Sequence, residues 1–205
     1  MKQLKYHQNS SEINYLIQKD PKLKNLFSRK EEIIVNIDED YFQSLAGVII
    51  AQQLSSKVAG VIYQRLRVLL ENQITPEKII NADEKELRGI GLSYPKIKYL
   101  KSLADCVIMS TVDLSKLDQL SNEEVIQMLV QVKGIGVWSA QMFLMFSLGR
   151  EDVFSVLDLG LRNALKKIYE SPNLTNQEIE ELSLKWSPYR SIVSHFLWHA
   201  WDSQT

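Results

Sequence analysis

Cysteine is almost absent from this sequence. Cys106 is the only one among 205 residues, so the chain cannot form an internal disulfide or hold an iron–sulfur cluster or structural zinc ion through several cysteines. Long apolar runs are missing too, because none approaches the ~18 residues that would span a membrane. The first twenty residues have no apolar stretch of the kind that signal peptides carry. We therefore expect an intracellular protein with no membrane association.

Neither sign of charge dominates the composition. The chain has 24 Lys and Arg and 25 Asp and Glu, for a formal net charge of -1. Proteins that bind nucleic acids are often basic, so this balance mildly disfavours such a partner. It does not exclude one, because backbone amides and a few local cations can hold a phosphate. Composition alone leaves the function open.

Helical periodicity runs through most of the chain. Apolar residues recur at steps of three and four in the stretches 40–70 and 121–132. The stretch 137–149 is apolar almost all round and predicts a central buried helix, and a further helix is expected over 158–170. Polar residues (AQQLSSK) inside the first stretch predict a break into two helices. Asp40 and Asp158 are candidate N-caps, and Ser121 with Glu124 has the spacing of a capping box. Segment 31–38 resembles a short, solitary strand. The length fits one large domain or two lobes, and we predict an all-α, two-lobed protein.

Glycine is scarce, with eight in the chain, yet two lie one residue apart in VKGIGVWSAQMF, residues 132–143. A turn between two helices needs one at most. Backbone amides at a helix start lack partners within the helix, and with the positive end of the helix dipole behind them they form an anion site. The residues that would make this site are Lys133, Gly134, Ile135, Gly136 and Val137. The alternative is a tight turn whose glycines serve backbone geometry alone, and the turn by itself favours that alternative.

Residues further along the chain shift that balance. Trp138 follows the turn, and twenty residues later Asp158 stands just before a helix, where one carboxylate oxygen would cap the helix while the other faces a cleft. Near the C-terminus, the stretch LKWSPYRSIVSHFLWHAW holds three of the four tryptophans. We expect Trp198 and Phe196 to be core residues. Trp186 stands two residues before a proline and ahead of a helix, and it is a better candidate for a pocket wall.

Four ordered motifs resemble those of a known family. VKGIGVWSAQMFLMFSLGREDVFSVLDLGLRNAL is similar to the signature of the helix-hairpin-helix DNA glycosylases, in particular the DNA-3-methyladenine glycosylase II branch. Three other stretches resemble further motifs of that branch: SLAGVIIAQQLSSKVAGVIYQRL, LRGIGLSYPKIKYLKSLAD and WSPYRSIVSHFLW. The resemblance predicts a glycosylase core over residues 41–205, with its hairpin at 121–149, and an N-terminal segment, 1–40, that packs on this core. The LRGIG stretch also echoes the KGIG hairpin within the chain.

The resemblance implies a role for several of these residues. The fold would be all-α and two-lobed, with double-stranded DNA bound across an active-site cleft between the lobes. Asp158 matches the catalytic aspartate of the family, and Gly134 and Gly136 match its phosphate-binding hairpin. Trp138 and Trp186 match positions that line the base pocket. Met142 stands where some relatives have a pocket tyrosine, which bears on base preference.

Further contacts and a cation site follow from the same resemblance. Gln53 falls where the branch inserts a side chain into the gap left by the flipped base, and Arg190 is another candidate for DNA binding. The hairpin of the family often holds a monovalent cation through backbone carbonyls, which here would be those of Val130, Val132 and Ile135. We expect no cofactor to be required beyond such a structural Na or K ion, and we expect a monomer.

The sequence departs from its relatives in ways that bear on the reaction. Many of them have Pro-x-Asp-Asp before the helix, whereas this chain reads SVLD at 155–158, so only the aspartate at the catalytic position is present. Members with lyase activity carry a Schiff-base lysine where this chain has Trp138, and endonuclease-III-like members carry a four-cysteine cluster. The absence of this lysine and of the cysteine cluster favours a monofunctional enzyme. The resemblance implies that it excises alkylated purines of the 3-methyladenine type by hydrolysis in base excision repair.

Two alternatives stay open at this point. One is a glycosylase for another purine lesion, such as a deaminated base, and the other is a non-catalytic helix-hairpin-helix DNA-binding protein. The combination of Asp158 with aromatic residues argues against a pure DNA-binding protein, which should also be richer in Lys and Arg. An enzyme of this kind would work in the cytoplasm, at the nucleoid, if its source is bacterial, and in the nucleus if its source is eukaryotic.

Overall fold

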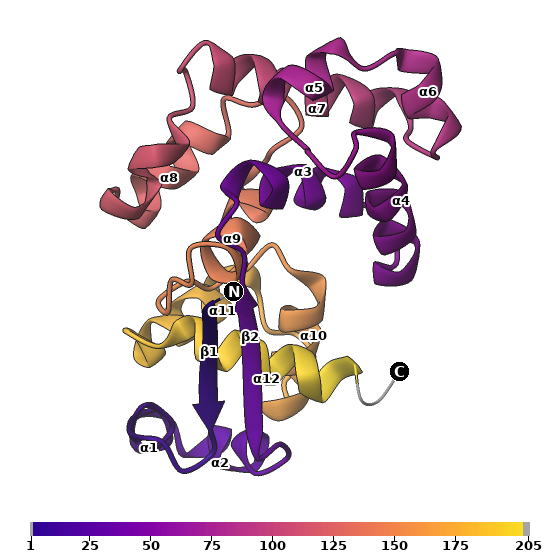
Figure 1. Ribbon diagram of the computed structural model, residues 1–205. Helices are drawn as coiled ribbons and strands as arrows, with labels where there is room; N and C mark the ends of the chain where they lie inside the picture. The colour runs from indigo at the N-terminus through magenta and orange to yellow at the C-terminus, as the bar shows by residue number, and fades with distance from the viewer. Residues whose placement is uncertain (1, 203–205) are drawn as a thin grey trace. The chain divides into compact units, whose positions relative to one another are not determined.

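The computed structural model describes residues 2–202, which are mostly helical with one two-stranded sheet. The chain folds into two compact units, whose elements are labelled in Figure 1. The terminal unit combines the residues up to Ile37 with those from Gly149 onward, and the middle unit runs from Asp38 to Leu148. The helical fold class is confirmed, and the strand pair is an addition to it. Across the described residues, no helix is long and apolar enough to cross a membrane.

The sheet of the terminal unit pairs the start of the chain with a segment thirty residues on. Strands β1 (Lys2–His7) and β2 (Glu32–Ile37) are antiparallel, with Lys2 opposite Ile37. Between them come α1 (Ser11–Lys19), the 3-10 helix η1 (Pro21–Leu23) and α2 (Lys24–Phe27), at the end of the sheet where β1 finishes (Figure 1). The expected strand at 31–38 is confirmed as β2. Its partner was not expected, because KQLKYH has too few apolar residues to predict a strand.

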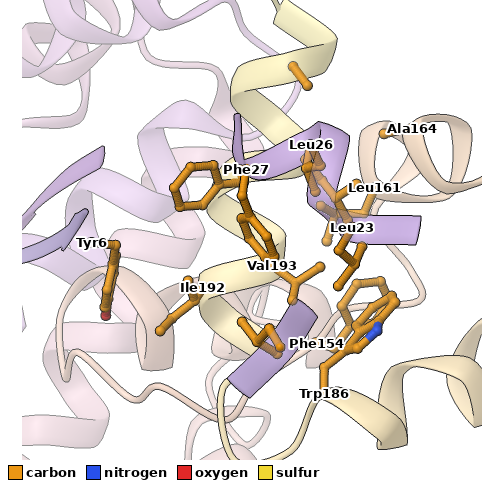
Figure 2. Close-up of a cluster of buried hydrophobic side chains, with 14 of the residues drawn as sticks. Tyr6, Leu23, Leu26, Phe27, Phe154, Leu161, Ala164, Trp186, Ile192 and Val193 are labelled. Atoms are coloured by element: carbon orange, nitrogen blue, oxygen red, sulfur yellow. The ribbon is translucent and has the colours of Figure 1, made fainter. Parts of the chain in front are cut away.

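The core of the terminal unit joins both ends of the chain. After Gly149 the unit contains α10 (Leu159–Ile168), α11 (Asn176–Ser183), the 3-10 helix η3 (Leu184–Trp186) and α12 (Arg190–Asp202). Figure 2 shows Phe27 from α2 lying in one cluster with Phe154, Trp186 and Val193. Phe196 on α12 is buried as expected and meets Phe27 edge to face, with ring centroids 4.9 Å apart. The N-terminal elements are therefore part of this core.

The middle unit is built of helices alone among its described residues. It contains α3 (Tyr41–Ala51), α4 (Ser56–Leu69), α5 (Pro76–Asn81), α6 (Glu84–Gly89), α7 (Tyr94–Ile108), the 3-10 helix η2 (Leu114–Gln119), α8 (Asn122–Leu129) and α9 (Val137–Phe146). The expected break in the 40–70 stretch lies between α3 and α4. Asp40 caps α3 by accepting from the Gln43 N–H at 3.0 Å, and Ser121 and Glu124 form the predicted capping box on α8. Local sequence signals thus set the starts of α3 and α8.

The internal echo of the KGIG hairpin is also a helical hairpin. In it, α6 leads through a turn containing Gly91, whose φ of 105° is in the left-handed region, into α7. Unlike α9, α7 begins with a serine cap, since the Ser93 hydroxyl accepts from the Lys96 N–H at 3.4 Å. The two turns share a sequence pattern, but of the two only the turn before α9 leaves its helix start without a side-chain cap.

Candidate active site

The two glycines of the KGIG turn do different things. Gly134 has a φ of 92°, and a Cβ atom there would lie 2.2 Å from the ring of Tyr99. An L-amino acid at this position would be strained by its backbone angle and would also collide with the tyrosine. Gly134 is therefore required by the packing of the turn against α7.

Gly136 has no such constraint. It is the N-cap of α9 with a φ of -98°, which any residue adopts, and apart from its chain neighbours no described heavy atom lies within 4 Å of the place that a Cβ would take. Hydrogen bonding within α9 begins at Ala140, whose N–H donates to the Gly136 carbonyl at 3.0 Å. The helix itself offers no acceptor to the N–H groups ahead of Ala140, and the N-cap residue Gly136 makes no side-chain cap. Space and amide donors coincide here, as an anion site requires.

The residues after this cap are open to solvent. Val137 and Trp138 are 43% and 37% exposed, although both side chains are large and apolar. Met142, one helical turn after Trp138, is 8% exposed and lies in the buried part of α9. The start of α9 therefore presents an aromatic side chain beside Gly136, while the rest of the helix packs into the unit.

Gln52, for which no role was expected, forms hydrogen bonds with the turn and the start of α9. The Gln52 side-chain amide donates to the Gly134 carbonyl at 2.8 Å and to the Ser139 hydroxyl at 3.4 Å. Gln53, which was singled out, is exposed and has a φ of 58° in the turn between α3 and α4. The two neighbouring glutamines thus differ: Gln52 binds the hairpin within the middle unit, and Gln53 faces solvent. In the sequence, only its place next to Gln53 marked Gln52.

The remaining hairpin residues lie between α8 and α9 or at the end of α8. The Lys133 side chain is exposed, and its backbone N–H donates to the Ser102 hydroxyl at 3.2 Å. Val130 is the C-cap of α8, and the Val132 carbonyl accepts from the Ile135 N–H at 3.0 Å. All three residues lie in the segment between the end of α8 and the start of α9. Neutral backbone oxygens of this kind are a suitable ligand set for a hard monovalent cation, because they supply dipoles without excess charge.

Asp158 is held at one oxygen by two donors. It is the N-cap of α10, and its Oδ1 accepts from the Leu161 N–H at 2.9 Å and from the Trp198 indole N–H at 3.1 Å. The predicted cap is therefore confirmed. Trp198 was expected to be an ordinary core residue, but it is only partly buried, and its polar edge binds Asp158. No sequence pattern marks this pair, whose members lie 40 residues apart along the chain.

Trp186 lies in a different environment from the one expected. Its side chain is fully buried in the core of the terminal unit (Figure 2), 5.6 Å from the Phe154 ring between centroids. Its indole N–H donates to Oδ2 of Asp20 at 3.1 Å, because a buried indole needs an acceptor. Asp20 is itself only 6% exposed and also accepts from the Tyr169 hydroxyl. The expectation that Trp186 forms a pocket wall is corrected here, since core packing encloses its ring.

Arg190 also has an internal partner. Its Nε donates to Oδ1 of Asp152 at 2.7 Å, and its Nη2 donates to Oδ2 of the same carboxylate at 3.1 Å. Burial acts to raise the pKa of Asp152, but hydrogen bonds from Arg190 and Ser187 outweigh it and hold that pKa below its usual range. This bidentate pair uses directional donors of the guanidinium, and a DNA contact by Arg190 stays a prediction.

The expected site residues divide between the two units. Asp158, Trp186 and Arg190 belong to the terminal unit, where Asp158 and Arg190 are partly buried and Trp186 is fully buried. The hairpin residues, Gln53, Trp138 and Met142 belong to the middle unit. The middle unit supplies an amide-lined helix start with an exposed indole, and the terminal unit supplies a carboxylate fixed at a helix start.

Comparison with known proteins places these features in a family context. Residues 46–188 match the sequence model of the HhH-GPD superfamily base excision DNA repair proteins. The chain is 35% identical over 161 residues to DNA-3-methyladenine glycosylase 1 of Schizosaccharomyces pombe, covering 77% of this chain and 71% of that protein.

Two solved structures resemble the fold closely. The crystal structure of a DNA-3-methyladenine glycosidase from Bacillus halodurans superposes with a TM-score of 0.87 at 31% identity, covering 98% of this chain and 94% of that one. The 3-methyladenine DNA glycosylase of Schizosaccharomyces pombe in complex with abasic DNA superposes with a TM-score of 0.81 at 31% identity, covering 92% and 95% of the two chains.

Proposed function

Because the chain belongs to the HhH-GPD superfamily of base excision DNA repair proteins, we propose that it is a DNA glycosylase that flips out and excises alkylated purines of the 3-methyladenine type. The observation that carries this proposal is the Asp158 carboxylate, fixed at the start of α10 by the Leu161 N–H and the Trp198 indole. The activities named for relatives in Schizosaccharomyces pombe and Bacillus halodurans support the same substrate class.

Asp158 is the residue that would act at the sugar. Cleavage of an N-glycosidic bond gives the anomeric carbon oxocarbenium character, as in sugar hydrolysis. A carboxylate held in one direction stabilises that developing positive charge and orients or deprotonates the attacking water. Two donors, one from α10 and one from α12, converge on Oδ1 of Asp158, which supports this role. We therefore propose Asp158 as the catalytic aspartate.

The protein would select its substrate base by the positive charge of that base, and no general acid would be needed to release it. An alkylated purine is positively charged and leaves without protonation, so the protein only has to bind it. An electron-rich ring favours such a cation over a neutral base by roughly 0.5–2 kcal/mol, and the exposed Trp138 indole is suited to this contact. Flipping the base costs a few kcal/mol, least at a damaged pair. A glycosylase for a deaminated purine is the second candidate, because Met142 replaces an aromatic pocket residue found in some relatives.

The hairpin would hold the DNA backbone. The open position above Gly136 lets a phosphate approach the first amides of α9, and the exposed Lys133 side chain adds a positive charge. Gln53 would enter the gap left by the flipped base, as its exposed place in the α3–α4 turn allows. If a Na or K ion binds, the carbonyls of Val130, Val132 and Ile135 would hold it and its charge would attract the phosphate. We propose that the protein does this as a monomer.

The reaction would end at an abasic site in an intact strand. A lyase needs an amine that forms an imine with the abasic sugar, and this chain has Trp138 where lyase relatives have that lysine. Water would therefore be the nucleophile. The alternative of a non-catalytic DNA-binding protein predicts the same hairpin but no dependence of any activity on Asp158.

Base release from methylated duplex DNA tests the proposal. Wild-type protein should release alkylated purines that chromatography separates, and a gel should show strand breaks only after alkali. Asp158→Asn keeps the oxygen that caps α10, so it should fold and bind DNA but lose most of the release. Asp40→Asn is the matched control, because Asp40 caps α3 through the same hydrogen bond, from the amide three residues on. Full activity of Asp158→Asn would refute the assignment, and covalent trapping by borohydride would refute the hydrolytic mechanism.

A further inference from the structure

The Trp198 side chain bridges α12 to the start of α10. Its indole Nε1 lies 3.1 Å from Oδ1 of Asp158, which is the oxygen that also accepts from the Leu161 N–H at 2.9 Å. One donor belongs to the backbone of α10 and the other to a side chain of α12, a helix that packs on α10. The carboxylate is therefore held by two elements that are themselves fixed to each other.

Two donors at one oxygen restrict a carboxylate more than one donor does. The last torsion of an aspartate side chain joins an sp³ to an sp² carbon and has a broad energy minimum. A single cap hydrogen bond leaves the carboxylate plane able to swing about the bonded oxygen. A second donor from a different direction removes that freedom, and with it the range of directions in which Oδ2 can point. Electrostatic stabilisation of a transition state depends on such fixed placement.

The indole is in turn supported from behind. His195, one turn earlier on α12, lies 5.8 Å from the Trp198 ring between centroids and is only 6% exposed. The Tyr6 ring stacks on His195 at 6.0 Å with an interplanar angle of 18°. A packed row of rings thus runs from β1 to the indole. Because these rings pack in a solid layer, the Trp198 N–H can move little relative to α10.

We propose that Trp198 is the positioning residue of Asp158, so that its indole N–H sets the direction of the carboxylate during base excision. The inference rests on the proposed function, in which Asp158 acts at the sugar. It assigns Trp198 no contact with the substrate. Its effect is on the rate of bond cleavage, while DNA affinity comes from the hairpin in the middle unit.

Removal of the indole N–H without a change of shape tests this inference. Benzothienylalanine at position 198 replaces the N–H with sulfur and keeps the bicyclic ring, and Trp198→Phe is the simpler genetic variant. Both should lower the single-turnover rate of base release roughly 10- to 100-fold, the loss expected for one hydrogen bond to a charged group. Affinity for duplex DNA with an abasic site should stay within about twofold. A role in packing alone would leave the rate of the benzothienyl variant unchanged.

Two controls separate this inference from the proposed function. Trp201→Phe alters another partly buried tryptophan of α12 and should keep the wild-type rate. Asp158→Asn tests the catalytic assignment itself. If Asp158→Asn is inactive while benzothienylalanine at 198 leaves the rate at the wild-type level, the positioning role is refuted and the proposed function stands. If Asp158→Asn is fully active, both are refuted.

An NMR measurement reports the hydrogen bond directly. The indole N–H of Trp198 should give a resonance that moves when Asp158 becomes Asn, because the acceptor changes from a charged to a neutral oxygen. The indole of Trp186 serves as an internal reference, since it donates to the Asp20 carboxylate at the same 3.1 Å distance. Its resonance should stay in place. A Trp198 resonance that ignores Asp158→Asn would overturn the inference.

Discussion

A Cβ atom on residue 160 would lie 3.2 Å from Oδ1 of Asp158. Gly160 is the second residue of α10 and has no unusual φ, so its backbone does not require glycine. The same Cβ would be 3.6 Å from Cδ1 of Trp198. Glycine at this position leaves the room in which the carboxylate and the indole meet.

Gly160→Ala should therefore change the enzyme's rate more than its stability. Alanine gains up to about 1 kcal/mol over glycine within a helix, and the tight contact with Oδ1 offsets part of this, so the thermal midpoint should move by only a few degrees. The added methyl group pushes the carboxylate out of place, and base release should fall severalfold. Single-turnover kinetics and thermal unfolding measure the two effects.

Gly60→Ala is the matched control for that substitution. Gly60 lies inside α4, and apart from its chain neighbours and the backbone of its own helix no described heavy atom comes within 4 Å of a Cβ there. This variant should gain stability and keep the wild-type rate. A rate for Gly160→Ala that equals the rate of Gly60→Ala would show that the Asp158 carboxylate tolerates the displacement.

Substitution of the two hairpin glycines should affect different properties, stability at Gly134 and DNA affinity at Gly136. Gly134→Ala combines a left-handed φ with a collision against Tyr99, so it should cost about 2 kcal/mol or more of unfolding free energy. Gly136→Ser fits the N-cap geometry and should leave stability unchanged within a few tenths of a kcal/mol. Its hydroxyl would occupy the amides proposed to hold phosphate, so affinity for undamaged duplex should fall roughly tenfold and become less dependent on salt. Urea unfolding and binding titrations at two salt concentrations distinguish the two positions, and unchanged affinity in Gly136→Ser would rule out the phosphate site.

Local chemistry was predictable from the sequence, and long-range pairing was not. The caps at Asp40, Ser121 and Asp158 follow from residues three positions apart, and the structure has all three. The partner of Trp186 is Asp20, which lies 166 residues away and carries no pattern that marks it as an acceptor for an indole. Aromatic spacing therefore identified a cluster of tryptophans without telling which one is core.

Trp198 was expected in the core and Trp186 at a pocket wall, whereas Trp186 is the buried one and Trp198 binds Asp158. This difference has a physical reason. Both indoles must place an N–H against an acceptor when buried, and each meets a carboxylate in the terminal unit. Which carboxylate each meets depends on the packing of α12 and η3 against the N-terminal elements, a tertiary property. The internal partner of Arg190 could not be predicted for the same reason, because Asp152 lies 38 residues away in an irregular segment.

Gln52 should stabilise the hairpin, whereas its neighbour should not. Gln52→Ala removes the donor to the Gly134 carbonyl, and the loss of one hydrogen bond should cost roughly 1–2 kcal/mol of unfolding free energy. Gln53→Ala alters an exposed side chain and should cost less than about 0.5 kcal/mol. Urea unfolding measures both. Equal stability of the two variants would mean that the Gln52 bracing does not contribute.

His195 should make stability fall as the pH drops from 6.5 toward 4. Burial lowers its pKa from 6.5 to about 4, so the folded protein keeps this imidazole neutral while the unfolded chain takes up a proton first. Its contribution is therefore complete above pH 6.5 and is lost through that window, by roughly 2 kcal/mol at pH 5. Unfolding free energies at pH 7.5 and pH 5 measure the loss. In His195→Asn, the difference in unfolding free energy between pH 7.5 and pH 5 should shrink by the same amount. An unchanged difference would exclude His195 as the source of the loss.

Ser155 should be better replaced by alanine. It is fully buried, and among residues 2–202 its Oγ has no hydrogen-bond partner. A buried hydroxyl without a partner carries a desolvation cost that no bond offsets. Ser155→Ala should therefore raise the free energy of unfolding by about 1 kcal/mol, measured by urea unfolding.

Ser191 is the matched control for this last substitution. It is also buried in the terminal unit, but its Oγ accepts from the Val153 N–H at 2.9 Å and donates to the Arg150 carbonyl at 2.6 Å. Ser191→Ala leaves both groups without that partner and should cost roughly 1–3 kcal/mol. The changes in unfolding free energy of the two variants should therefore have opposite signs. This separates the effect of hydrogen bonding from the effect, common to both, of deleting an oxygen atom. If Ser155→Ala also lost stability, the hydroxyl at 155 would have a partner such as a buried water, and its desolvation cost would already be met.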